Sequence, residues 1–188
     1  MMGPQISEIV SRGGLVAVLQ NGQGISTFSS DDFKTADTIV ACAITQLNID
    51  VHRIYAAGCE EGGLQAGAML YYRSSYLAAA MPSSEGILSP APALENPNHV
   101  PALITAHGAP GSDLYVVDRS QTSLAECADV KSKGGFAVDC NHGGGVCGAP
   151  ADLIAAQWQF CKDHPYGVSP EPYGSGLPSS FPSYCAVQ

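Results

Sequence analysis

Five short apolar runs alternate with stretches of helical periodicity, and this alternation constrains the fold more than any other feature of the sequence. Short apolar runs bounded by glycine and asparagine are typical of buried strands, whereas apolar residues three or four apart are typical of amphipathic helices. Alternating strands and helices predict an α/β fold, a mostly parallel sheet with helices on both faces. The predicted strands are 15–19, 51–57, 77–81, 102–106 and 136–140, and the predicted helices are 33–47, 64–72, 123–133 and 149–164.

The length and the charge of the chain indicate one domain and argue against some classes of binding partner. The 188 residues suffice for one domain, which we place at 1–165, followed by a proline-rich tail at 166–188. A net charge of −9 without any cluster of basic residues argues against binding nucleic acid or an anionic membrane surface. No apolar run reaches the roughly 20 residues that a membrane helix needs.

Seven cysteines beside only eight basic residues are typical of a secreted protein with disulfides. Zinc is the alternative, but the closest cysteines, Cys140 and Cys147, are too far apart for a CxxC-type pair. A bond between Cys140 and Cys185 is plausible and would hold the tail. We therefore expect an extracellular protein, although the first residues lack the pattern of a signal peptide.

Residues 55–64 combine a strand, a Gly-x-x-x-Gly turn and a helix of small residues. This is the frame of a nucleophile elbow, in which the central residue projects from the sheet and the following N–H helps to bind an oxyanion. Gly58 and Gly62 frame the turn here, Glu60 is central, and Glu61 supplies the oxyanion N–H. Serine is the residue expected at position 60, so the frame is present while its chemistry is changed.

The partners of an elbow nucleophile are an acid and a histidine that follow later strands. Asp113 follows the predicted strand 102–106 and suits the acid. A glycine-rich loop follows the strand 136–140 and contains one histidine, His142.

These motifs resemble secreted α/β-hydrolase esterases of the polyhydroxybutyrate depolymerase, feruloyl esterase and tannase-like group, over about residues 15–165. In that group the elbow commonly reads Gly-Cys-Ser-Ala-Gly-Gly and the late loop Gly-Gly-Gly-His-Cys-Gly. By this resemblance Glu60 stands at the serine position, Val146 at the histidine position and Asp113 at the acid position, although its spacing from His107 is longer than usual.

The resemblance has two further implications. It implies a disulfide between Cys59 and Cys147, which flank the serine and histidine positions. It also implies about three strands before the one at 15–19, including the loop that carries the second oxyanion donor. This chain has only 14 residues there, so we expect a sheet that is reduced at its N-terminal side and half of the oxyanion hole to be missing.

Several interpretations remain open for the site. Glu60 is an inactivating replacement, a carboxylate nucleophile, or a solvated loop acid. His142 is a loop histidine or a substitute base, and a metal site of His142, Asp113 and Glu60 is conceivable, although we predict neither metal nor cofactor.

The resemblance thus implies a carboxylic-ester hydrolase by descent, weak or inactive, whose substrates are small or polymeric phenolic, acetyl or hydroxyalkanoate esters. The alternatives are a non-catalytic ligand-binding descendant and a hydrolase that uses Glu60 as nucleophile. An exposed edge at 15–19 further predicts a homo-oligomer or an aggregation-prone monomer.

Overall fold

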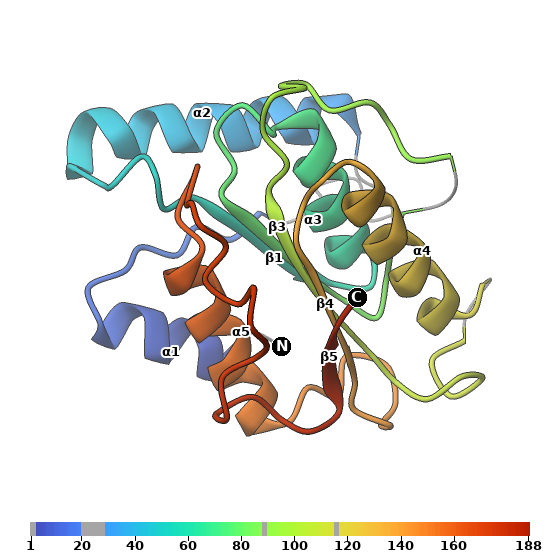
Figure 1. Ribbon diagram of the computed structural model, residues 1–188. Helices are drawn as coiled ribbons and strands as arrows, with labels where there is room; N and C mark the ends of the chain where they lie inside the picture. Colours follow the sequence, from blue (N-terminus) through green and yellow to red (C-terminus); the bar gives the residue numbers. More distant parts are fainter. Residues whose placement is uncertain (1–2, 20–28, 88–89, 115–116) are drawn as a thin grey trace.

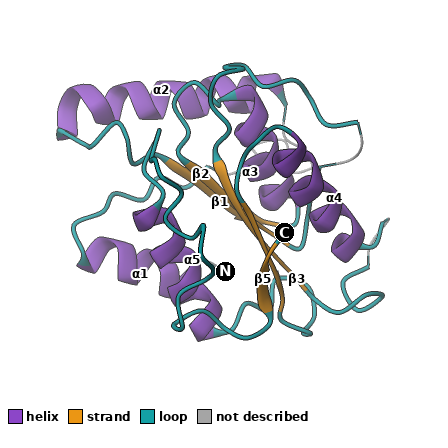
Figure 2. Cartoon of the chain, in the orientation of Figure 1, coloured by secondary structure: helices purple, strands orange, loops and turns teal. Residues whose placement is uncertain are grey.

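The structure is a computed structural model that describes residues 3–19, 29–87, 90–114 and 117–188 (Figures 1 and 2). Within these residues the elements are, in chain order, α1 (Gly3–Ser11), α2 (Ser30–Leu47), β1 (Tyr55–Cys59), α3 (Glu61–Tyr72), β2 (Ala79–Ser83), β3 (Ala102–His107), α4 (Arg119–Ser132), β4 (Ala137–Asn141), α5 (Ala151–Asp163) and β5 (Cys185–Val187).

The described strands form one sheet in the order β1-β2-β3-β4-β5. Strands β1 to β4 are parallel, and β5 pairs antiparallel with β4. The predicted fold class, a mostly parallel α/β sheet, is therefore confirmed. Because parallel strands end at one edge, the segments that follow β1, β2, β3 and β4 all begin at the carboxyl edge of the sheet.

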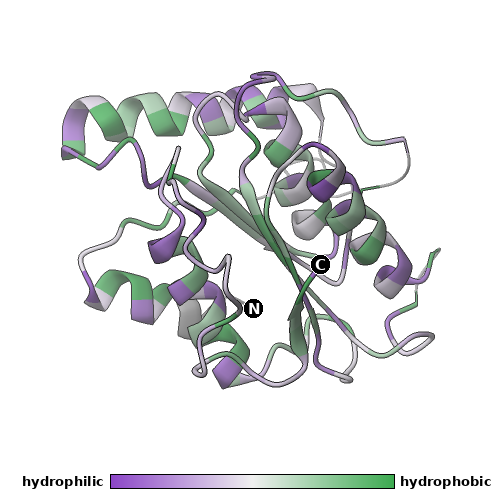
Figure 3. Cartoon of the chain, in the orientation of Figure 1, coloured by the Kyte–Doolittle hydropathy of each residue, from purple (hydrophilic) through white to green (hydrophobic). Residues whose placement is uncertain are grey.

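Alternation along the strands divides the core into two layers. On one face Ala80 and Leu103 belong to a cluster with α3 and α4, and on the other face Ala79 and Ile104 belong to a cluster with α5. Figure 1 shows the same division, with α3 and α4 on one side of the sheet and α5 beside α1 on the other. Most strand residues are apolar, whereas the helices mix polar and apolar residues along their length (Figure 3).

The predicted helices are all present, with shifted ends. Helix α2 begins three residues earlier than expected because Ser29 is its N-cap, and Asp32 completes a capping box with it. Strand β1 begins at Tyr55 rather than at residue 51, because the Asp50 carboxylate accepts the His52 N–H (2.9 Å) and holds a turn there.

The predicted strand at 15–19 is wrong. These residues follow α1 without regular structure, and Leu15 and Val18 are 54% and 74% exposed. Leu19 packs against the core, but the run as a whole pairs with none of the described strands. The terminal strand on this side of the described sheet is β1, which leads into the elbow. We therefore expect the edge of the sheet at β1 and not at residues 15–19.

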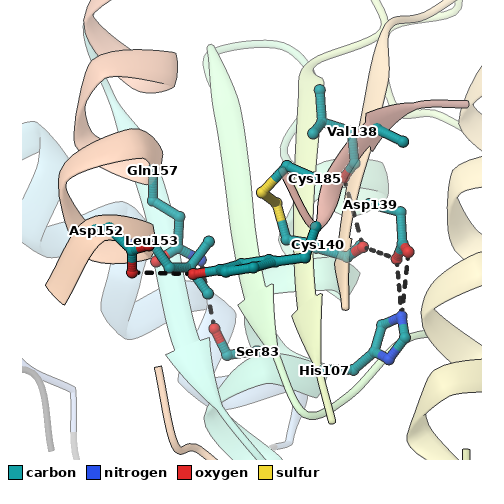
Figure 4. The surroundings of a disulfide bond; sticks show 12 residues. Ser83, His107, Val138, Asp139, Cys140, Asp152, Leu153, Gln157 and Cys185 are labelled. Carbon is teal, nitrogen blue, oxygen red and sulfur yellow. Dashed lines mark hydrogen bonds and ion pairs between the residues drawn. A yellow bond between two sulfur atoms is a disulfide. The ribbon is translucent and has the colours of Figure 1, made fainter. Parts of the chain in front are cut away.

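The tail contributes to the sheet and to the core. Cys185 in β5 is bonded to Cys140 in β4 (Figure 4), and both expected pairings, this one and Cys59–Cys147, are present. Tyr173 and Phe181 of the tail are buried in the cluster on the α5 face. Neither α1 nor β5 was expected from the sequence. No described helix combines the length and the apolar character that crossing a membrane requires.

Candidate active site

The turn between β1 and α3, residues 58–63, has the backbone of a nucleophile elbow. Glu60 lies between the strand and the helix at φ 51° and ψ −121°, a conformation that a residue with a side chain rarely adopts. Its N–H donates to the Ser83 carbonyl (3.1 Å), and its carbonyl accepts from Leu64 (2.9 Å). These bonds fix residue 60 at the carboxyl edge of the sheet, where an elbow places its nucleophile.

Two glycines are required by this turn. A Cβ on Gly58 would overlap the Gly62 carbonyl, and a Cβ on Gly63 would lie 2.8 Å from the Ser83 carbonyl oxygen. Gly62, in contrast, has nothing within 4 Å of an added Cβ. The backbone of α3 therefore approaches β1 and β2 more closely than any side chain at positions 58 or 63 would allow.

The Cys59–Cys147 disulfide brings the loop between β4 and α5, residues 142–150, to the elbow. The two Cα atoms are 5.8 Å apart, and the Cys147 N–H donates to Ser84 Oγ (2.8 Å). Val146, at the expected histidine position, is therefore adjacent to the bonded pair in sequence. Its side chain is 42% exposed and carries no group that could accept a proton.

Asp113 lies buried in the loop after β3, at the position expected for the acid. Its Oδ2 accepts the Gly108 N–H (3.2 Å), and its Oδ1 has no partner among the described residues. The same loop touches the 142–150 loop, because Ser112 Oγ donates to the Gly144 carbonyl (3.2 Å). A carboxylate oxygen is thus left without a donor where two of the candidate loops meet.

His142 is half-buried, and its N–H donates to the His107 carbonyl (3.0 Å). Its Nδ1 accepts the Gly144 N–H (3.1 Å), so the neutral ring carries its proton on Nε2. Burial lowers the pKa of His142, while the charge of Asp113 opposes this shift. With its one lone pair occupied, the ring is poorly placed to act as a base.

His107 and Asp139 form a buried pair on the α4 side of the sheet, where Figure 4 shows their side chains pointing toward each other. His107 Nε2 lies 3.0 Å from Asp139 Oδ1, and Nδ1 lies 2.7 Å from the Gly108 carbonyl oxygen. Burial alone would lower the pKa of His107, but the hydrogen bonds to Asp139 and Gly108 raise it above its ordinary value. Because a carbonyl oxygen and a carboxylate oxygen only accept, both nitrogens donate, and Gly108 is held beside Asp113.

Sequence reasoning missed this pair and a second one, Glu85 with Arg119. The signal for the first was a charged residue, Asp139, within an apolar strand, since a buried carboxylate needs a donor. Glu85 lies just beyond β2, is buried and forms an ion pair with Arg119 of α4. Burial raises the pKa of Glu85, against the charge of Arg119. We find no pattern in the sequence that indicates this partner.

The described residues contain no group of three or more histidine, cysteine or acidic side chains that could hold a metal ion. The conceivable set of His142, Asp113 and Glu60 is therefore not assembled. The acids Glu60 and Glu61 instead stand at the amino-terminal end of α3.

No protein-family model and no curated protein matches the chain. Solved structures described as native sOPH and native pOPH share its fold, with TM-scores of 0.63 and 0.65 and 20% and 17% identity. A serine-to-alanine variant of pOPH in complex with pNPB has a TM-score of 0.67 at 16% identity. The matches cover 87%, 84% and 87% of this chain but only 61%, 58% and 61% of those chains. At this identity the likeness establishes the α/β fold alone.

Proposed function

We propose that this chain is a carboxylic-ester hydrolase by descent, in which ester cleavage is weak or absent because its nucleophile and base have been replaced. The observation that carries the proposal is Glu60, which has the backbone of an elbow nucleophile but the side chain of an acid. The substrate class is that of phenolic, acetyl or hydroxyalkanoate esters. The complex of a pOPH variant with pNPB supports an ester ligand for a fold of this kind.

The charge of Glu60 opposes the expected chemistry. An acyl transfer develops negative charge on the carbonyl oxygen, and the Glu61 N–H at the start of α3 is the donor we assign to it. A carboxylate at position 60 would repel this charge at short range. A serine hydroxyl is neutral until it attacks, so the same backbone would favour the transition state with serine and disfavour it with glutamate.

The absence of a base at position 146 also makes ester cleavage weak or absent. Asp113 retains a free buried oxygen, but Val146 offers no imidazole for it to orient. We therefore assign Asp113 the role of the acid of a dismantled triad, and we assign His142 no part as base.

Reversal of the two changes tests the proposal. The unmodified chain should cleave p-nitrophenyl esters at the buffer rate or only slightly above it, whereas Glu60→Ser with Val146→His should cleave them clearly faster. Either substitution alone should restore little, because nucleophile and base act as a unit. Glu60→Ser with Val146→Gln is the matched control, since glutamine has similar bulk but cannot take the proton. A folded double variant that remains at the buffer rate would refute the assignment of positions 60 and 146.

A carboxylate nucleophile is the second candidate, favoured because Glu60 makes no capping hydrogen bond to α3. Attack by this carboxylate on the carbonyl carbon breaks the bond to the alcohol oxygen, releases the alcohol and forms an anhydride, which water must then cleave. If the unmodified chain cleaves esters and Glu60→Gln abolishes the activity, this candidate replaces the first. Saturable ester binding without cleavage would instead favour a ligand-binding descendant.

We further propose an extracellular location, supported by the two disulfides. A homo-oligomer that pairs along β1 is proposed because β1 is the terminal strand of the described sheet. Sedimentation of a single monomeric species at high concentration would refute the oligomer.

A further inference from the structure

Gly108, the residue directly after β3, is the point at which two loops of the site meet. Its N–H donates to Asp113 Oδ2 (3.2 Å) within the loop after β3. A Cβ at this position would overlap the Gly144 carbonyl of the loop after β4. The His107 carbonyl, which precedes Gly108, accepts the His142 N–H (3.0 Å) of that same loop. The position of Gly108 therefore sets the positions of both loops.

The ring of His107 fixes Gly108 by a further contact, to its carbonyl. Nδ1 lies 2.7 Å from that oxygen, and Nε2 lies 3.0 Å and 3.2 Å from the two oxygens of Asp139 (Figure 4). The Thr105 hydroxyl also donates to Asp139 Oδ1 (2.8 Å), and two donors on one carboxylate favour its ionised form. Because a carbonyl and a carboxylate only accept, this arrangement requires a proton on each nitrogen of the ring.

The charged groups around this ring favour its protonated form. Burial opposes a charge there, but the carboxylates of Asp139, Asp113 and Asp118 stabilise one. His142 would oppose a second positive charge, but burial lowers its pKa, so its ring is neutral at neutral pH. Burial raises the pKa of the Cys127 thiol of α4, which therefore adds no charge.

Loss of one ring proton would turn an attraction into a repulsion. The carboxylate of Asp139 binds the Nε2 proton more strongly than a neutral carbonyl binds the other, so Nδ1 is the atom that loses its proton. The lone pair of Nδ1 would then face the carbonyl oxygen of Gly108 at 2.7 Å, and this peptide would have to turn. A turn there would break the contacts of Gly108 with Asp113 and Gly144.

We propose that His107 is a positioning residue, whose doubly protonated ring fixes Gly108 and, through it, both Asp113 and the loop after β4. Loss of the proton then displaces the two loops together. The role of Asp113 as an acid rests on the proposed function, whereas the hold of His107 on the two loops does not.

The first experiment follows the unmodified chain by NMR from about pH 5 to about pH 9. Both ring nitrogens of His107 should carry protons at about pH 6, and its pKa should lie above the ordinary value of 6.5. The backbone amides of Gly108 and Gly144 should shift with the same midpoint. His142→Asn removes a second titrating ring, and its Oδ1 can still accept the Gly144 N–H. A neutral His107 ring at about pH 6, or a Gly144 amide in His142→Asn that does not follow His107, would overturn the proposal.

The second experiment removes the charge that holds the proton. Asp139→Asn keeps an acceptor for His107 and should lower the pKa of its ring by about one pH unit or more. The Gly108 amide should then shift at the same lower pH. Glu171→Gln is the matched control, since it removes the carboxylate of a second pair with a buried histidine, His164, and should leave the titration of His107 unchanged. An unchanged His107 titration in Asp139→Asn contradicts the proposal, and the unmodified chain decides the question if this variant does not fold.

The third experiment measures the effect on catalysis in the double variant Glu60→Ser, Val146→His. Adding Asp139→Asn should lower kcat about tenfold with little change in KM, because a displaced acid orients the introduced imidazole poorly. The activity should also be lost at a lower pH than in the double variant, which a merely structural effect would not produce. Glu171→Gln should change neither. An unchanged kcat and pH profile would overturn the proposal. A double variant at the buffer rate would refute the proposed function instead, and the NMR titrations then decide on His107.

Discussion

The elbow after β1 and the loop after β4 meet at the Cys59–Cys147 bond, yet they are held by different means. At the elbow, glycines at 58 and 63 permit a close backbone approach, and hydrogen bonds fix residue 60. At the loop, Cys147 is fixed by its bond and by Ser84, while Val146 is 42% exposed. The geometry of the elbow does not need its reactive side chain, so the backbone can persist when the chemistry of residue 60 has changed.

Removal of the disulfides should lower the free energy of unfolding more than any other change to the elbow or the loop. The Cys59–Cys147 bond spans 88 residues and the Cys140–Cys185 bond spans 45. Chain entropy predicts losses of about 4–5 kcal/mol for Cys59→Ala with Cys147→Ala, and about 4 kcal/mol for Cys140→Ala with Cys185→Ala. Urea denaturation measures both. A loss of less than about 1 kcal/mol from the first pair would mean that the elbow and the loop meet without their bond.

Gly58→Ala should distort the turn at residues 58–63 while both disulfides remain, and it should lower the free energy of unfolding. Its Cβ would overlap the Gly62 carbonyl, and relief requires movement of the backbone, at a cost of about 3 kcal/mol. Gly62→Ala is the matched control, because its Cβ meets nothing and alanine favours the helix by about 1 kcal/mol. Equal stabilities of the two variants by urea denaturation would contradict the tight turn.

The sequence predicts the elbow because glycines mark a turn that side chains would block, although the second glycine that the turn requires is Gly63 and not Gly62. The expected pairing of Cys59 with Cys147 came from the family resemblance, and the structure contains it. The apolar run at 15–19 misled because a local pattern does not reveal whether a neighbouring strand is present to pair with it. Strand β5 has only three residues, too few for a periodic signal, and the Glu85–Arg119 pair depends on a contact between residues 34 positions apart.

The helix that follows the elbow rests on a buried acid, which gives its stability a pH dependence. A Cβ on Gly67 of α3 would lie 2.6 Å from Oε1 of Glu126, whose oxygens make no well-formed hydrogen bond within the described residues. Burial raises the pKa of Glu126 to about 8; the Ile87 N–H opposes this shift, and the charges of Asp129 and Glu85 add to it.

The unfolded chain releases this proton near the ordinary pKa of a glutamate, whereas the folded chain keeps it until about pH 8. The free energy of unfolding should therefore fall as pH rises from about 4.5 to about 8, by up to about 1.4 kcal/mol per pH unit. Glu126→Gln removes this proton and should flatten the profile, measured by urea denaturation at several pH values. Glu8→Gln, which changes a partly exposed acid paired with Arg12, serves as control, and an unchanged slope in Glu126→Gln would refute the assignment.

The smallest expected effect is the strain at residue 60. A residue with a Cβ at φ 51° costs about 1–3 kcal/mol relative to an unstrained position, whereas glycine adopts this conformation freely. Glycine also costs about 0.5–1 kcal/mol through the unfolded chain, so Glu60→Gly should stabilise the protein by about 1 kcal/mol. Glu60→Ala removes the same carboxylate but keeps the Cβ, and it should leave the stability nearly unchanged. The difference in free energy of unfolding between Glu60→Gly and Glu60→Ala measures the strain of the backbone, because both variants lack the carboxylate. If urea denaturation finds that Glu60→Ala stabilises the protein as much as Glu60→Gly, then Glu60 lowers the free energy of unfolding through repulsion from Glu61 and not through strain in the turn.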